Sequence, residues 1–159
     1  MDSAFFAYGD KTKEFLIKRS VYLIEYLKHK CDVIILACNT LSIVALPFLK
    51  LIYNNVYGVF EELQLQINNR SAVIGSTNTV MYLSKIYKDV LFIDGRLLIN
   101  AIEKNLDIKE YVDVINELIK DRDNIILACT HFLRLKDNTF IIKELEIKNS
   151  HYKWEFYLL

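Results

Sequence analysis

The sequence predicts an α/β protein built on parallel strands. Short apolar runs of strand length alternate along the chain with longer segments whose apolar residues recur at helical spacing. One Pro and four Gly in 159 residues leave little room for long loops. Because alternating strands and helices imply a parallel sheet with helices on both faces, we expect this layout, either as one sizeable domain or as two small lobes.

The first half of the chain is expected to hold two strands and two helical segments. Residues 12–29 carry apolar side chains at helical spacing. Residues 32–37 form a continuous apolar run, typical of a strand that is buried on both faces. Residues 42–51 are expected to be helical, with Pro47 kinking or restarting the helix. A short strand is expected over residues 56–60.

The second half continues the alternation. In open parallel sheets, ligands bind beyond the carboxyl ends of the strands, so the residues that follow each apolar run are the candidates for a site. Strands are expected at 71–75, 90–93 and 124–128, and helices at 79–87, 97–105 and 109–120 and after His131.

Composition excludes several classes of function. Twenty basic residues balance twenty acidic ones, and no basic patch predicts a nucleic acid or an anionic membrane as partner. The first residues do not resemble a signal peptide, and the apolar runs are far shorter than the ~20 residues of a membrane span. Three widely spaced cysteines, with no CxxC pair, favour free thiols in a reducing cytoplasm over disulfides or a structural zinc site.

Two of the predicted strands end in nearly the same way. One is followed by Cys38-Asn39-Thr40 and the other by Cys129-Thr130-His131, each after an Ile-Ile-Leu-Ala run. This weak internal repeat would place two thiols on either side of a small ligand. The alternative for a single cysteine at a strand end is burial in the core. Cys31 has no comparable context and is interpreted as structural.

Other strand ends and loops offer weaker signals. Ser76, Thr77 and Thr79 follow a strand that ends at Gly75, where hydroxyls either cap a helix or hold a carboxylate. Residues 8–9, Tyr-Gly, are expected in a loop, where an ordinary turn is the alternative. His131 has two possible roles, which are to support the neighbouring thiol or to cap the start of a helix, and both stay open.

Together these motifs resemble the aspartate/glutamate racemase superfamily, and glutamate racemase most closely. The family's paired Cys-Asn-Thr and Cys-Thr-His motifs match residues 38–40 and 129–131 without substitution. Its D-T-A-x-x-P-Y-G segment is similar to residues 2–9, with Ala7 in place of Pro, and its G-T-x-x-T strand end is similar to residues 75–79. The resemblance covers about residues 2–135.

The resemblance implies two flavodoxin-like parallel-sheet lobes related by pseudo-duplication. The first lobe would comprise residues 1–65 and the second residues 66–135, with residues 136–159 returning to the first. Family members open with a strand and an Asp-Ser-Gly motif that this sequence lacks, so the first lobe is expected to be incomplete. The tail also differs from the family's continuation, so the chain is expected to be truncated at both ends.

The resemblance also implies an activity and a site. Cys38 and Cys129 would interconvert L- and D-glutamate by two-base proton transfer at Cα, aided by His131 and without a cofactor or a metal. The product would supply peptidoglycan, and hence cell-wall biogenesis and cell shape, in the cytoplasm. The expected partner is a small-molecule substrate, with a homodimer as the expected assembly. The substrate-binding residues would be Tyr8, Gly9, Asn39, Thr40, Ser76, Thr79, Thr130 and His131.

The missing Asp-Ser-Gly segment bears on that activity. In the family its Asp assists the first thiol, so Cys38 is expected to be poorly activated and turnover to be weak or absent. Two alternatives stay open at this point. The chain is a non-catalytic remnant or binding module of the same family, or it is a racemase of aspartate.

Overall fold

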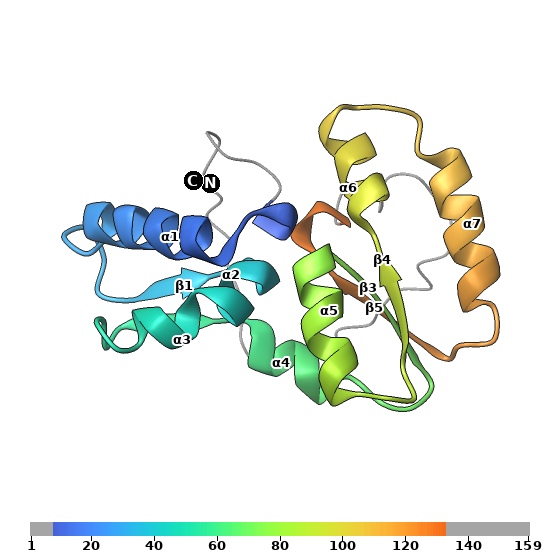
Figure 1. The fold of residues 1–159 in the computed structure, drawn as a ribbon, viewed down its shortest axis with the longest axis horizontal. Helices are drawn as coiled ribbons and strands as arrows, with labels where there is room; N and C mark the ends of the chain where they lie inside the picture. Colours follow the sequence, from blue (N-terminus) through green and yellow to red (C-terminus); the bar gives the residue numbers. More distant parts are fainter. Residues whose placement is uncertain (1–7, 133–159) are drawn as a thin grey trace.

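A computed structural model describes residues 8–132 as two small parallel sheets flanked by helices (Figure 1). The α/β class and the parallel strands are therefore confirmed, and the strands form one sheet of two strands and one of three. The helices are η1 (Tyr8–Asp10), α1 (Lys13–Leu27), α2 (Asn39–Val44), α3 (Leu46–Leu49), α4 (Phe60–Leu65), α5 (Thr77–Ile86), α6 (Arg96–Glu103) and α7 (Lys109–Ile119). The strands are β1 (Ile34–Leu36), β2 (Val56–Gly58), β3 (Ser71–Gly75), β4 (Leu91–Asp94) and β5 (Asn124–Ala128).

The first sheet pairs β1 with β2 in parallel, and α1, α2 and α3 pack against it. Thr12 caps α1 by accepting a hydrogen bond from the Phe15 N–H at 3.3 Å. The helical segment expected around Pro47 is two short helices that meet at Ala45, with Pro47 in the first turn of α3, where a missing N–H costs nothing. The inward strand residues Ile34, Leu36 and Val56 share one apolar cluster with these three helices.

The expectation that residues 32–37 are buried on both faces is wrong. Ile35 is 45% exposed, and its register partner Tyr57 is 50% exposed. All three helices contribute to the one cluster on the inward side of the sheet, and the side that carries Ile35 and Tyr57 is exposed. The continuous apolar run therefore does not indicate burial on both faces here.

The second sheet has the strand order β4-β3-β5, with β3 in the centre and parallel to both neighbours. All five residues of β3 are buried. Val73 faces a cluster formed with α4 and α5, and Ile74 faces a cluster formed with α6 and the residues of α7 that pack on it. This sheet therefore has the two covered faces that the sequence predicts.

Helix and strand bounds mostly follow the sequence. The strands predicted at 71–75 and 124–128 have those bounds. The strand predicted at 56–60 instead ends at Gly58, because the Val59 N–H bonds the Ser42 hydroxyl at 3.3 Å rather than a neighbouring strand. Helix α4, which the sequence pattern did not predict, starts directly afterwards at Phe60.

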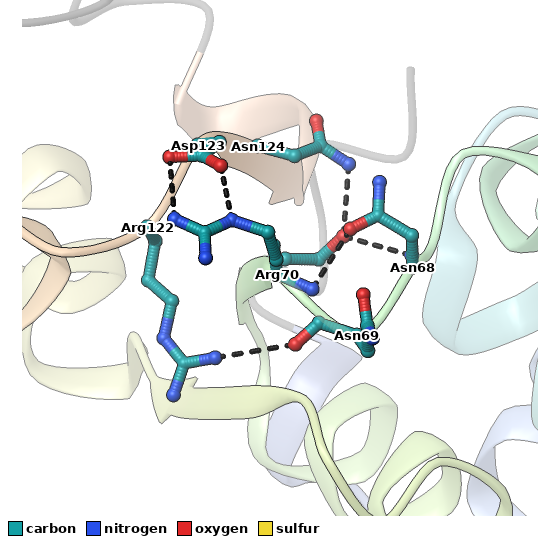
Figure 2. Close-up of polar contacts among 7 residues, drawn as sticks. Asn68, Asn69, Arg70, Arg122, Asp123 and Asn124 are labelled. Carbon is teal, nitrogen blue, oxygen red and sulfur yellow. Dashed lines mark hydrogen bonds and ion pairs between the residues drawn. The ribbon is translucent and has the colours of Figure 1, made fainter.

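Polar side chains join the amino ends of β3 and β5, at the edge of the sheet opposite the candidate site (Figure 2). The Arg70 guanidinium donates two hydrogen bonds to the Asp123 carboxylate, one of them 2.9 Å long. The Asn124 amide donates to the Gln66 carbonyl at 2.7 Å and to the Ser71 hydroxyl at 2.8 Å. These contacts fix how the two strands enter the sheet.

Two expectations fall partly or wholly outside the described part of the chain. The lobe boundaries at 65 and 135 stay a prediction, and the helix expected after His131 and the return of residues 136–159 lie beyond Phe132. For the stretch that is described, no helix is long and apolar enough to cross a membrane.

Candidate active site

The candidate site lies where the carboxyl ends of β1, β3 and β5 meet, between the two sheets. Helix α2 begins directly after β1 and contacts α5, which begins directly after β3 (Figure 1). The Asn39 amide donates a hydrogen bond to the Ala128 carbonyl at 3.1 Å. That bond joins the residue after Cys38 to the residue before Cys129, so the two similar motifs lie side by side.

A second link between the sheets is a buried row of hydroxyl groups. Thr40 Oγ1 and Ser76 Oγ are 2.8 Å apart, and Ser76 Oγ and Thr79 Oγ1 are 3.0 Å apart. The three side chains are almost fully buried. A hydroxyl both donates and accepts, so this row can reorient to donate to a carboxylate that enters the site.

The Tyr8-Gly9 segment is part of the same site. It forms the short helix η1, which contacts both α2 and α5. A Cβ added at Gly9 would lie 2.4 Å from the Ser76 Cβ, so only glycine allows this close approach. Tyr8 packs on the apolar cluster of the first sheet. Residues 2–7, the rest of the segment that is similar to the family's D-T-A-x-x-P-Y-G motif, lie outside the described residues.

Cys38 lies at the start of helix α2. It is the N-cap residue of α2 and is half-buried. Burial raises the pKa of its thiol, and the N–H groups of Leu41 and Thr40, with the Thr40 hydroxyl, offset that rise only in part. The groups that favour its thiolate are therefore backbone and hydroxyl dipoles rather than a charged side chain.

Cys129 lies in a different environment. Its Sγ is 3.3 Å from His131 Nδ1, and His131 Nε2 is hydrogen-bonded to the Glu103 carboxylate. Burial, with smaller contributions from the charges of Cys38 and Glu103, raises the pKa of the Cys129 thiol to about 11, against an opposing effect of the His131 N–H. The hydrogen bond from Asn39 to the Ala128 carbonyl brings the strand ends that carry Cys38 and Cys129 together.

Sequence reasoning missed Glu103. It is the last residue of α6, a helix whose buried side consists of Leu98, Ile99, Ala101 and Ile102. The helix was predicted, but no motif connects its end to the Cys-Thr-His segment. Only the packing of α6 on the second sheet brings the carboxylate to His131, so no local signal could have identified it.

The remaining predicted site residues, Thr130 and Asn39, differ in how far solvent reaches their side chains. Thr130 lies in the turn after β5 and is exposed, whereas Asn39 is half-buried with an Oδ1 atom that has no hydrogen-bond partner among the described residues. A buried acceptor without a donor suits an ammonium group of a ligand.

Cys31 is exposed and its thiol contacts the Leu27 carbonyl at 3.5 Å. Among residues 8–132, no cluster of three acidic, His or Cys side chains could hold a metal ion.

This geometry is found on a chain whose matches among known proteins are glutamate racemases. The chain is 31% identical to the glutamate racemase of Aliivibrio salmonicida, over 93% of this chain and 62% of that protein. It is 30% identical to the glutamate racemase of Borreliella burgdorferi, over 85% of this chain and 58% of that protein. No protein-family model matches it. The chain spans about three fifths of the length of these curated relatives.

Solved structures agree with the sequence matches. The glutamate racemase of Campylobacter jejuni has a TM-score of 0.69 at 27% identity, covering 86% of this chain and 63% of that one. The glutamate racemase of Francisella tularensis, solved in complex with D-glutamate, has a TM-score of 0.67 at 24% identity over 84% and 58%, which shows the shared fold alone. The resemblance to glutamate racemases that the motifs predicted is confirmed.

Proposed function

We propose that this relative of the glutamate racemases interconverts L- and D-glutamate without a cofactor, by proton transfer at Cα between Cys38 and Cys129. The observation that carries the proposal is the pairing of the two thiols. They follow strands of different sheets, and the hydrogen bond from Asn39 to the Ala128 carbonyl holds the two strand ends together. Two acid–base groups on opposite sides of one carbon are the minimum that such a reaction needs.

The proton balance needs no other reagent. One cysteine, as thiolate, takes the proton from Cα and becomes a thiol, while the electron pair stays on the carbon and is delocalised into the adjacent carboxylate. The other cysteine, as thiol, gives its proton to the opposite face and becomes a thiolate. In the reverse direction the two exchange roles, so both must be able to ionise.

Ionisation is the difficult part of this chemistry. The pKa values of both thiols are raised, that of Cys129 to about 11, so a thiolate is scarce at neutral pH in the empty site. In the proposed mechanism, His131 lies between Cys129 and Glu103 and holds or accepts a proton at Nδ1. Cys38 relies on the dipoles at the start of α2, so we expect it to limit the rate.

The polar groups around the thiols fit a small amino acid. In the proposal, the free Asn39 Oδ1 accepts a hydrogen bond from the substrate ammonium group. Thr40, Ser76, Thr79 and Thr130 donate to its carboxylates, and η1, with Tyr8 and Gly9, closes one side. The proposal includes supply of D-glutamate for peptidoglycan in the cytoplasm. A homodimer stays a prediction that no observation tests.

The test is an isomer-specific assay on the purified full chain. Each enantiomer of glutamate is incubated in D2O, and the products are followed by chiral chromatography and by deuterium at Cα, with aspartate as the competing substrate. Cys38→Ser and Cys129→Ser should each abolish racemisation, and each should abolish exchange from the enantiomer whose Cα proton the altered cysteine removes. Cys31→Ser, which alters an exposed thiol, should leave both unchanged. Binding of glutamate without exchange would contradict the proposal and favour a binding module, and faster turnover of aspartate would correct the substrate.

A further inference from the structure

Asp94, the last residue of β4, has a set of contacts that the proposed reaction does not use. The Thr77 hydroxyl donates to both oxygens of its carboxylate, at 2.9 and 3.1 Å. The Arg96 backbone N–H donates to one of the same oxygens at 3.0 Å. Thr77 begins α5 and Arg96 begins α6, so one carboxylate binds the first residues of two helices.

The same corner also contacts the turn that carries Cys129. The Gly95 N–H donates to the Gly75 carbonyl at 2.8 Å, which continues the pairing of β4 with β3. A Cβ at Gly95 would lie 2.7 Å from the ring of Phe132, which is fully buried and directly follows His131. The Asp94-Gly95 corner therefore contacts α5, α6 and the end of the Cys129–Phe132 turn.

Each of these segments presents a group to the candidate site. The start of α5 carries Ser76 and Thr79, which form the buried hydroxyl row with Thr40. The end of α6 carries Glu103, which bonds His131. The far end of α6 is capped, because Asn105 adopts a left-handed conformation (φ 51°) and the Leu106 N–H bonds the Ala101 carbonyl at 2.9 Å. A helix of eight residues that is capped in this way is expected to move as one unit, so a displacement at Arg96 would reach Glu103.

We propose that Asp94 is a positioning residue, which sets the substrate-binding hydroxyls through Thr77 and the Glu103–His131 pair through Arg96. The inference rests on the proposed function for what the site binds, although its geometry does not depend on turnover. Its carboxylate accepts hydrogen bonds from the first residue of each helix, so one side chain can hold both helices. Asp94 does not contact the thiols, and its effect on them passes through α6.

Two variants separate the two connections. Asp94→Ala removes both, whereas Thr77→Val removes only the bond to α5 and leaves Asp94 bound to Arg96. Two readouts report on the two halves of the site in the full chain. One is the KM for glutamate, and the other is the rate at which iodoacetamide alkylates Cys129 at pH 8, followed by mass spectrometry of the peptide that contains it.

We expect Thr77→Val to raise KM about fivefold, the change that follows loss of one capping interaction, with the alkylation rate unchanged. Asp94→Ala should raise KM similarly and should also speed alkylation of Cys129 about fivefold, because α6 is released and the charge of Glu103 moves away from the thiol. Asp113→Asn, at an exposed carboxylate on α7, is the matched control and should change neither value.

Asp94→Asn distinguishes position from charge. It keeps a carbonyl oxygen for Thr77 and Arg96, so both values should stay close to those of the unaltered chain. If Asp94→Ala does not fold, Thr77→Val tests the connection to α5, and an unchanged KM in that variant would overturn the inference. An effect of Asp94→Asn on alkylation as large as that expected for Asp94→Ala would indicate charge and overturn the inference. So would an Asp94→Ala protein that behaves like Asp113→Asn. Alkylation needs no turnover, so an unaltered chain without racemisation would contradict the proposed function alone.

Discussion

The two halves of the site support their cysteines in different ways. Cys129 has a titratable neighbour, His131, which is bonded in turn to Glu103. Cys38 has the N–H groups at the start of α2 and the Thr40 hydroxyl. One thiol thus lies beside an imidazole that is bonded to a carboxylate, and the other depends on dipoles that are fixed when the helix forms.

In the proposed racemisation, this difference cannot appear as a larger kcat/KM for one enantiomer. L- and D-glutamate have equal free energies in water, so kcat/KM must be the same in both directions whatever the two thiols are like. The asymmetry must instead appear in the reactivity and the pH dependence of each thiol. The reactivity and the pH dependence of each separate thiol are therefore the quantities to measure.

The largest effect is expected from removing the imidazole that lies beside Cys129. His131→Asn should lower kcat/KM by about 10²–10³-fold, within the range typical of a lost acid–base helper, and equally in both directions. Chiral assays started from each enantiomer measure it. His29→Asn, in the loop after α1, is the control and should have no effect. A kcat/KM in His131→Asn equal to that of the unaltered chain would contradict a role of His131 in the reaction.

The next effect is on stability at alkaline pH. The pKa of Cys129 is raised in the folded chain from 9.0 to about 11, so this thiol ionises more readily in the unfolded chain. Below pH 9 both states are protonated and nothing is lost. As pH rises from 9 to 11, the free energy of unfolding should fall by about 2–3 kcal/mol through this residue.

Urea unfolding at a series of pH values measures that loss, with Cys129→Ser as the comparison because it removes the thiol. The difference in unfolding free energy between the two proteins should change across this window and level off above it. An identical pH dependence in both proteins would contradict the raised pKa of Cys129.

A smaller effect should separate the two thiols directly. Glu103→Gln removes a negative charge that raises the pKa of Cys129, so at pH 8 Cys129 should be alkylated several-fold faster, whereas the rate at Cys38 should stay within about twofold. Mass spectrometry of the two cysteine peptides reads both rates from one sample. Equal acceleration of both thiols would show that the two environments are not independent.

The smallest effect tests whether the opposite edge of the sheet matters to the site. Arg70 and Asp123 are largely exposed, with side chains 62% and 65% accessible, so Arg70→Ala should lower the free energy of unfolding by less than about 1 kcal/mol. Neither thiol should change its alkylation rate. A change at Cys129 would show that the amino ends of β3 and β5 influence their carboxyl ends.

The sequence was informative wherever the controlling interactions are local. Strands 71–75 and 124–128 were predicted with their bounds because apolar runs between turn residues define a buried strand, and Pro47 marks a helix start because it lacks an N–H. The repeated cysteine motifs also predicted that Cys38 and Cys129 each follow the end of a strand.

What could not be predicted depends on how elements pack. Glu103 reaches His131 only because α6 lies on the second sheet, and no spacing in the sequence encodes that distance. Ile35 was expected to be buried because its run is wholly apolar, but exposure depends on which segments cover that face. The short helix α4 was missed because it depends on the Ser42 contact that ends β2.

The hydrogen bond from Asn39 to Ala128 has a consequence for how the chain reaches its native state. Its two residues are 89 positions apart, whereas the paired residues Ser71 and Asn124 of β3 and β5 are 53 apart. Contacts of long sequence separation cost more chain entropy than the local helices and adjacent strand pairs, so they are expected late in folding. Each sheet can form while the two thiols are still far apart. In refolding, burial of Cys38 beside Cys129 should therefore belong to the final phase, after most of the helical signal has been recovered.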